Sequence, residues 1–349
     1  MILLNEIIFD DIKNITNFPL SWMKFSGNTF LISGANGFLP SYMIHTLLYL
    51  NKKFSKKIKI FAIVRNKNKS EKVFSDYLQD PALKIIAHDL TKPLKLNSKI
   101  DYIIHAASQA SPKFYKIDPV GTLLPNVIGT KNLLDLAVKN KIKCFLFFSS
   151  GEVYGNFKNK KIEENSFGSI DPTELRSCYA ESKRMGENMC ISWYNQYKVP
   201  TKIARIFHTY GPGMKLDDGR VFADFVSNVV QNKNLIVKGD GKVIRPFCYI
   251  SDTTLALFTI LLKGRSGESY NVSNPNCRIR IKNLAKLLST LFPEKNLQVK
   301  HKEIQSKIYM KTKIPDQNPS IDKLLKLGWY PTNNLKEGFL RTILSYKMN

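Results

Sequence analysis

Short apolar runs alternate with longer, partly apolar stretches over the first two thirds of the chain. The short runs, of five to seven residues, have the length of buried strands, and most lead into small or polar residues. They span residues 28–33, 58–64, 85–90, 102–107, 144–148 and 201–207. The longer stretches predict helices at 41–50, 119–140 and 177–197. Strands that alternate with helices in this way predict an α/β fold with a Rossmann-type, doubly wound parallel sheet.

The same pattern divides the chain into three parts. Residues 1–26 precede the first strand and predict a helical N-terminal extension. Residues 27–207 predict a Rossmann NAD(P)-binding domain, with return segments near 245–262. From 208 to 349 the alternation loosens, glycine and proline punctuate the sequence, and a helix is expected at about 221–231. This last part predicts a smaller C-terminal lobe that closes over the strand ends and binds the substrate.

The first strand runs into Gly34-Ala35-Asn36-Gly37-Phe38-Leu39-Pro40 and then into a helix. In this setting Gly34 makes the tight turn, and Gly37 lets backbone amides approach a pyrophosphate. The helix N-terminus adds partial positive charge. Pro40 replaces the third glycine of the motif, which the first helical turn tolerates because the missing N–H of proline costs nothing there. The stretch therefore predicts a dinucleotide site with altered helix-on-sheet packing.

The residue after the second strand bears on which dinucleotide binds. An acidic side chain there holds the ribose of NAD, whereas arginine suits the 2′-phosphate of NADP. This position is Arg65, which favours NADP and leaves NAD open.

Candidate chemistry gathers at the end of the 144–148 strand and on the 177–197 helix. The strand delivers Ser149-Ser150-Gly151-Glu152-Val153-Tyr154-Gly155, and the helix carries Tyr179 and Lys183. Residues four apart share one helix face, so the Lys183 ammonium is expected beside the Tyr179 phenol. It should bring the pKa of the phenol from near ~10 toward neutrality. With the Ser150 hydroxyl nearby, this set predicts removal of a proton from a substrate alcohol while hydride leaves the same carbon.

The composition limits the classes of protein to which this chain can belong. The 349 residues carry a net charge of +25, but the lysines are spread without an arginine-rich block, so we interpret them as a solvated surface and expect no nucleic-acid partner. The five cysteines form no CxxC pair, which indicates reduced thiols, a cytoplasmic location and no metal site. No apolar stretch is long enough for a membrane span, and the acidic start is unlike a signal peptide.

Seven segments together resemble the extended short-chain dehydrogenase/reductase family, the NAD-dependent epimerase/dehydratases of nucleotide sugars. These are GANGFLP, HDL at 88–90, HAA at 105–107, SSGEVYG, the Tyr179/Lys183 pair, RIFHTYGPG and the Arg245 region. Within the family, ASQASPKFY at 107–115 and RSCYAESKR at 176–184 are similar to segments of UDP-glucuronate decarboxylases. The resemblance also implies a homodimer in which the 119–140 and 177–197 helices of two subunits pack as a four-helix bundle.

The resemblance further implies a role for each matching residue. Tyr179 is the base for the sugar 4-hydroxyl, Ser150 binds the same hydroxyl, and Lys183 holds the nicotinamide ribose. The residues expected to bind the cofactor are Gly34, Asn36, Gly37, Phe38, Leu39, Arg65, Asp89, Leu90, Ala106, Ala107, Ser108, Tyr179 and Lys183. Those expected to bind the nucleotide sugar are Ser111, Tyr115, Arg176, His208, Arg220, Val221 and Arg245.

The step that follows C4 oxidation depends on the residues after Ser150. A 4-ketone lets a glucuronate lose CO₂, whereas dehydration needs a base and an acid side by side. The family's dehydratases place Asp and then Glu here, its decarboxylases Ser and then Glu, and this chain has Gly151 and Glu152. We interpret Glu152 as catalytic, which favours a UDP-glucuronate-type decarboxylase. A 4,6-dehydratase or a 4-epimerase stays open. So does a catalytically silent dinucleotide-sensing regulator, against which the intact Ser150, Tyr179 and Lys183 argue.

Overall fold

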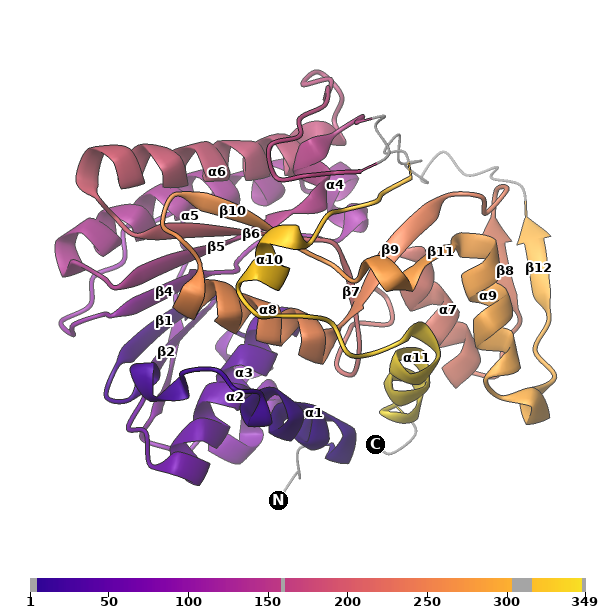
Figure 1. Cartoon of the computed structure of the whole chain (residues 1–349), viewed down its shortest axis with the longest axis horizontal. Helices are drawn as coiled ribbons and strands as arrows, with labels where there is room; N and C mark the ends of the chain where they lie inside the picture. Colours follow the sequence, from indigo (N-terminus) through magenta and orange to yellow (C-terminus); the bar gives the residue numbers. More distant parts are fainter. Residues whose placement is uncertain (1–4, 158–160, 303–315, 347–349) are drawn as a thin grey trace.

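The computed structural model describes residues 5–157, 161–302 and 316–346, which form a large sheet domain and a smaller lobe (Figure 1). The strands are β1 Thr29–Ser33, β2 Lys59–Val64, β3 Leu83–Ala87, β4 Tyr102–His105, β5 Cys144–Ser150, β6 Thr201–Ile206, β7 His208–Tyr210, β8 Leu235–Lys238, β9 Ile244–Tyr249, β10 Glu268–Val272, β11 Arg278–Arg280 and β12 Val299–Lys302. The α-helices are α1 Glu6–Asn17, α2 Phe38–Phe54, α3 Lys67–Val73, α4 Pro112–Ile117, α5 Pro119–Asn140, α6 Ser177–Tyr197, α7 Val221–Val230, α8 Ile250–Lys263, α9 Ile281–Thr290, α10 Asp322–Lys326 and α11 Leu335–Leu344.

Seven strands form one parallel sheet in the order β10-β6-β5-β4-β1-β2-β3. The chain moves one way from β1 to β3 and the other way from β4 to β6, so the predicted doubly wound sheet is confirmed. All six predicted strands are present, with bounds within three residues of those expected. The seventh strand, β10, lies further along the chain than the return segment expected near 245–262.

Two apolar layers enclose this sheet. The side chains of Phe30 and Ile32 point to the layer under α2 and α8, and Leu31 between them points to the layer under α5 and α6. This alternation is what a strand buried on both faces requires. The helices α5 and α6 have the predicted bounds and pack along each other (Figure 1). The helix α2 begins three residues earlier than predicted, because Pro40 fits into its first turn.

The expected N-terminal extension is packed into the fold. Its first four residues lie outside the described residues, and α1 contacts α2 and α8. The buried carboxylate of Asp11 accepts hydrogen bonds from Arg341 (2.7 Å), Tyr249 (2.9 Å) and Tyr42 (3.2 Å). One side chain therefore ties α1 to α2, to β9 and to α11.

The smaller lobe contains two small sheets, β11-β9-β7 and β12-β8, packed with α7, α9 and α11. It lies to the right of the central sheet in Figure 1. Because β7 begins two residues after β6 ends, the lobe starts at the carboxyl edge of the sheet, where open α/β sheets bind ligands. No helix in the described ranges is long and apolar enough to cross a bilayer.

Candidate active site

The turn between β1 and α2 has the geometry of a pyrophosphate site. Gly34 has a φ of +64°, and a Cβ added there would lie 2.7 Å from Cα of Ala107. Asn36 lies in the same turn, and Gly37 precedes α2 without a side-chain cap. The backbone amides of Phe38 and Leu39 therefore have no carbonyl of their own helix to bind. The open helix end favours an anion, and the close approach at position 34 requires glycine.

The segment after β4 faces this turn. The Ser33 hydroxyl oxygen accepts hydrogen bonds from the amides of Ala106 (3.1 Å) and Ala107 (3.2 Å) and lies 2.8 Å from Nδ1 of His105. These contacts hold the carboxyl ends of β1 and β4 together. Within the described chain, the buried Oγ of Ser108 has no hydrogen-bond partner. An unsatisfied hydroxyl near an open helix N-terminus fits a bound dinucleotide, so the residues present suit the expected cofactor.

The residues expected near the adenosine lie on the neighbouring strand ends. Arg65 directly follows β2 and is exposed, Asp89 follows β3 and is exposed, and Leu90 is buried. The pKa of Asp118, at the start of α5, is lowered by a hydrogen bond from Gln109 and further by the charge of Arg65. The charge of Arg65 therefore reaches the start of α5.

The structure brings the predicted serine, tyrosine and lysine together. Ser150 ends β5 and Tyr179 lies in the first turn of α6, close enough that the Ser150 hydroxyl lowers the pKa of Tyr179. Lys183 follows one turn later, and its Nζ lies 5.8 Å from the centre of the Tyr179 ring. The same Nζ donates to the carbonyl of Phe148 at 2.7 Å, which fixes α6 against β5.

The expected lowering of the Tyr179 pKa by Lys183 is wrong. Burial raises the pKa of Tyr179 to about 12, and the Glu152 charge adds to this, while Ser150 and Arg220 act in the opposite direction. Burial also lowers the pKa of Lys183 to about 7, which the nearby Glu187 partly offsets. The spacing along the helix predicted that Tyr179 and Lys183 are neighbours. It did not show that burial disfavours both the tyrosine anion and the lysine cation.

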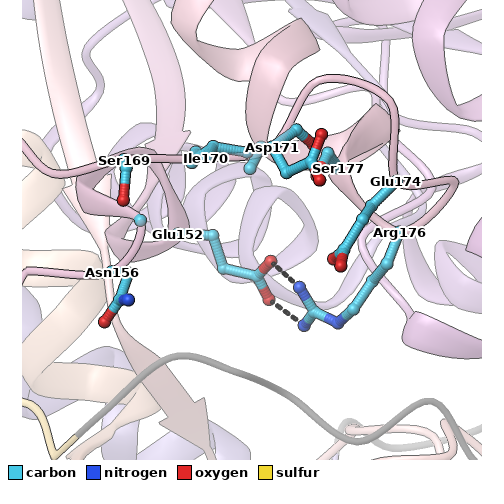
Figure 2. Close-up of a pocket in the computed structure, with 10 residues that line it drawn as sticks. Glu152, Asn156, Ser169, Ile170, Asp171, Glu174, Arg176 and Ser177 are labelled. Atoms are coloured by element: carbon cyan, nitrogen blue, oxygen red, sulfur yellow. Dashed lines mark hydrogen bonds and ion pairs between the residues drawn. The ribbon is translucent and has the colours of Figure 1, made fainter.

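Glu152 and Arg176, expected in separate roles, form one ion pair. Two guanidinium nitrogens of Arg176 donate to the two carboxylate oxygens of Glu152, at 3.0 and 3.1 Å (Figure 2). Burial alone would lower the pKa of Arg176, but the carboxylate more than offsets this and raises it. Tyr115 lies under the guanidinium, 5.7 Å away, and stacks on Tyr179 with ring centres 5.1 Å apart. The pair is thus connected by two rings to the predicted base.

This ion pair borders a pocket of about 180 Å³ beside α6. The pocket is lined mainly by polar side chains from the segment that leads into α6: Asn156, Ser169, Asp171, Glu174 and Ser177. Figure 2 shows Glu152 entering it from one side and Glu174 lying beside Arg176. Sequence reasoning did not predict this acidic pocket, and no motif indicated it.

A buried ion pair below the site was also missed. The carboxylate of Glu187 accepts three hydrogen bonds from Arg205, at 2.7 to 3.2 Å, and a fourth from Ser149 at 2.5 Å. It lies one turn beyond Lys183, so Tyr179, Lys183 and Glu187 form one row on α6. Extending the four-residue spacing by one step would have found it.

On the lobe side, two arginines gather near one histidine. Burial lowers the pKa of His208 to about 3, and the charges of Arg245 and Arg220 lower it further. His208 is therefore neutral, and its Nε2 lies 3.1 Å from Oε1 of Gln317. Arg278 donates to the carbonyl of Gln317 at 3.0 Å. The residues expected to bind the diphosphate thus lie together, and Gln317 and Arg278, which the sequence did not suggest, adjoin them.

The remaining predicted substrate residues join the sheet domain to the lobe. The Ser111 hydroxyl donates to the carbonyl of Asp218, Arg220 forms an ion pair with the same residue, and Val221 begins α7. Tyr115 is held by a hydrogen bond from its hydroxyl to the carbonyl of Ala110 at 3.1 Å. These contacts position the start of α7 over the strand ends.

Comparison with known proteins agrees with this arrangement. The profile of the NAD dependent epimerase/dehydratase family matches residues 30–273. UDP-glucuronic acid decarboxylase 5 of Arabidopsis thaliana is 34% identical over 327 residues, 92% of this chain and 90% of its own. UDP-glucuronic acid decarboxylase 1 of Xenopus tropicalis is 33% identical over 314 residues, 90% of this chain and 70% of its own. The fold matches DesIV, a dTDP-glucose 4,6-dehydratase from Streptomyces venezuelae solved with NAD and TYD, with a TM-score of 0.78 at 22% identity over 92% of this chain and 97% of that one.

Proposed function

The chain belongs to the NAD dependent epimerase/dehydratase family, and on this premise we propose that it decarboxylates a nucleotide-linked glucuronate, with UDP-glucuronate as the first candidate. The observation that carries the proposal is the Glu152–Arg176 ion pair beside Ser150 and Tyr179. Exchange of hydride at C4 needs no such pair, whereas chemistry at a carboxylate on C5 does. The relatives that match nine tenths of the chain are named for this reaction.

The residues have the following parts in the proposed reaction. NAD, the cofactor of the family, would supply the exchange of hydride at C4 of the sugar. Tyr179 removes the proton of the 4-hydroxyl, Ser150 binds the same oxygen, and Lys183 fixes the position of both through its bond to β5. The amides at the start of α2 and the Ser108 hydroxyl hold the cofactor pyrophosphate. Arg220 and Arg245 bind the substrate diphosphate, which guanidinium groups recognise well.

The alternative of a 4,6-dehydratase is disfavoured by the surroundings of Gly151. The family's dehydratases carry an acid at this position. A Cβ added to Gly151 would lie 2.6 Å from the ring of Phe207, so the phenyl group fills the space of such a side chain. A 4-epimerase would leave the Glu152–Arg176 pair without a role.

The test is mass spectrometry of the purified protein with NAD and a panel of nucleotide sugars. Loss of the mass of CO₂ from UDP-glucuronate supports the proposal. Loss of the mass of water indicates dehydration, and an unchanged mass with a shifted retention time indicates epimerisation. Either of the last two results with every sugar acid would contradict decarboxylation.

The proposal includes a homodimer. On the outer face of α5, Val120, Leu124 and Ile128 are 60%, 39% and 37% exposed and four residues apart, and Met185 on α6 is 49% exposed. A second copy of the same face supplies a matching apolar surface. Sedimentation of the native chain should give twice the monomer mass, and Leu124→Asp should give a monomer.

We place the proposed enzyme in the cytoplasm. The five cysteines form no disulfide in the structure, which supports a reducing compartment.

A further inference from the structure

Arg176 already holds a carboxylate in the geometry with which arginine binds sugar acids. Its two terminal nitrogens meet the two oxygens of Glu152 at 3.0 and 3.1 Å, and the two side chains are only 17% and 20% exposed (Figure 2). A parallel pair of hydrogen bonds of this kind suits any carboxylate, whether it belongs to a side chain or to a ligand. Glu152 thus occupies a carboxylate receptor.

Glu152 does not satisfy this receptor completely. The Nε–H of Arg176 is buried and has no acceptor within the described residues. A buried donor without a partner is costly, so the guanidinium can gain from an additional or different oxygen ligand.

The receptor lies at the right place for a sugar carboxylate. The guanidinium of Arg176 packs on the Tyr115 ring, and that ring stacks on Tyr179 with an interplanar angle of 13°. The charge of Glu152, the carboxylate that Arg176 holds, also raises the pKa of Tyr179, so the receptor lies within electrostatic reach of the group that would meet the 4-hydroxyl. The same pocket is lined by Asp171 and Glu174, so the arginine is the cation that lines it.

We propose that a nucleotide sugar acid binds by exchange, in which its carboxylate replaces Glu152 on Arg176. This rests on the proposed function, because it requires a sugar with a carboxylate on C5. The exchange makes Arg176 the residue that selects the acid over a sugar with a hydroxymethyl group. It also releases the side chain of Glu152 next to the reacting carbons.

The released Glu152 takes up a proton. After the exchange it has lost its cation and faces the substrate carboxylate, with Asp171 and Glu174 in the same pocket. Tyr115, Cys178 and Tyr179 also adjoin it and carry no positive charge, and Arg220, whose charge acts on both tyrosines, is paired with Asp218. Negative surroundings favour the neutral acid, and the pocket gives the proton a route from solvent.

The exchange supplies the proton that the decarboxylation consumes. The C5–C6 bond of the 4-keto acid breaks, its electron pair passes into the C4–C5 enolate, and C6 leaves as neutral CO₂. Glu152 then gives its proton to C5, which restores the ketone for return of the hydride. Since CO₂ no longer binds the guanidinium, the new Glu152 carboxylate pairs again with Arg176. The proton consumed by the reaction is the one taken up during binding.

The experiment is calorimetry of ligand binding in buffers with different heats of ionisation, using the full chain with NAD and with Tyr179→Phe to stop turnover. Near neutral pH, UDP-glucuronate should bind with uptake of nearly one proton, and UDP-glucose with almost none. Glu152→Gln should abolish the uptake and bind UDP-glucuronate several-fold more tightly, because the competitor for Arg176 is weakened. Its affinity for UDP-glucose should not change. A structural role of Glu152 predicts weaker binding of both ligands, and Glu152→Ala repeats the test without an amide.

Arg176→Gln should remove a preference of about tenfold or more for the acid, the size expected for charge-assisted hydrogen bonds. The matched control is Arg184→Gln on α6, because Arg184, like Arg176, binds the turn after β5 but does not line the pocket. Equal proton uptake with both ligands, or an unchanged preference in Arg176→Gln, overturns the exchange. If wild-type enzyme shows the exchange but releases no CO₂ from UDP-glucuronate, the proposed function fails and the exchange stands.

Discussion

The proposed cofactor side of this site is formed mainly by backbone groups, and the proposed substrate side by charged side chains. On the cofactor side the site is formed by a glycine with positive φ, by an open helix N-terminus and by two strand ends that Ser33 joins. On the substrate side the groups are charged side chains from separate segments. Glu152 and Arg176 come from either end of the segment between β5 and α6, and Arg220 and Arg245 come from the lobe.

This difference separates fixed geometry from exchangeable contacts. A backbone turn has one conformation and offers its amides to any phosphate. A side-chain ion pair offers its arginine to whichever carboxylate binds better, so it can respond to the substrate. The two sides meet at Tyr179, which lies near Ser150 at a strand end and stacks on Tyr115, the ring under Arg176.

The largest effect is expected at this meeting point. Tyr179→Phe removes the proposed base but keeps the ring that stacks on Tyr115, so NAD should remain bound while turnover falls about a thousandfold. Single-turnover absorbance of the reduced nicotinamide measures the step directly. The control is Tyr197→Phe, a half-exposed tyrosine on the same helix, which should keep full activity. Normal turnover in Tyr179→Phe would refute the mechanism.

A substitution in the glycine turn on the cofactor side should lower both the stability of the fold and the affinity for NAD. Gly34→Ala places a Cβ 2.7 Å from backbone of Ala107 at a φ of +64°, so we expect a loss of about 2–4 kcal/mol in the free energy of unfolding and much weaker NAD binding. Gly213→Ala is the matched control. It has a φ of +83° and no atom within 4 Å of the added Cβ, so it should cost about 1 kcal/mol and leave NAD binding intact. Urea unfolding and NAD titration separate the two effects, and equal losses in both variants would show that strain, not the close approach, is responsible.

The same division decides what could be predicted from sequence. The sheet, α5, α6 and the Gly34 turn follow from local patterns, because each depends on residues near one another in the chain. The pairing of Glu152 with Arg176, and of His208 with Gln317, depends on how distant segments pack, and no spacing reports it. The predicted direction of the Tyr179 pKa shift is wrong for a related reason. The helix spacing places Lys183 beside Tyr179, but only the packed structure shows that Tyr179 is buried and that the charge of Glu152 acts on it.

On the substrate side, removing one lobe arginine should weaken binding without stopping chemistry. Arg245→Leu is expected to raise the KM for the nucleotide sugar about thirtyfold, or about 2 kcal/mol, with a smaller change in kcat. Arg265→Leu, at a residue that lies mostly in solvent, is the control and should leave KM unchanged. A fall in kcat at constant KM would move Arg245 from diphosphate binding into the reaction itself.

The smallest expected effect is a difference in acid sensitivity between the two sides. His105, on the cofactor side, has its pKa lowered from 6.5 to about 3 by burial and then by Lys183, whereas burial and two arginines lower that of His208. A lowered histidine pKa means that the unfolded chain binds more protons, so each histidine destabilises the fold as pH falls below 6.5, by about 1.4 kcal/mol at pH 5.5. His105→Gln should reduce by nearly one the number of protons taken up on unfolding, which is measured from the urea midpoint as a function of pH.

Saturating UDP should also reduce the number of protons taken up on unfolding. It does so by raising the pKa of His208, because a bound diphosphate offsets the charges of the two arginines, and it should leave the pKa of His105 unchanged. An equal response of both histidines to UDP would mean that the two sides are electrostatically one site.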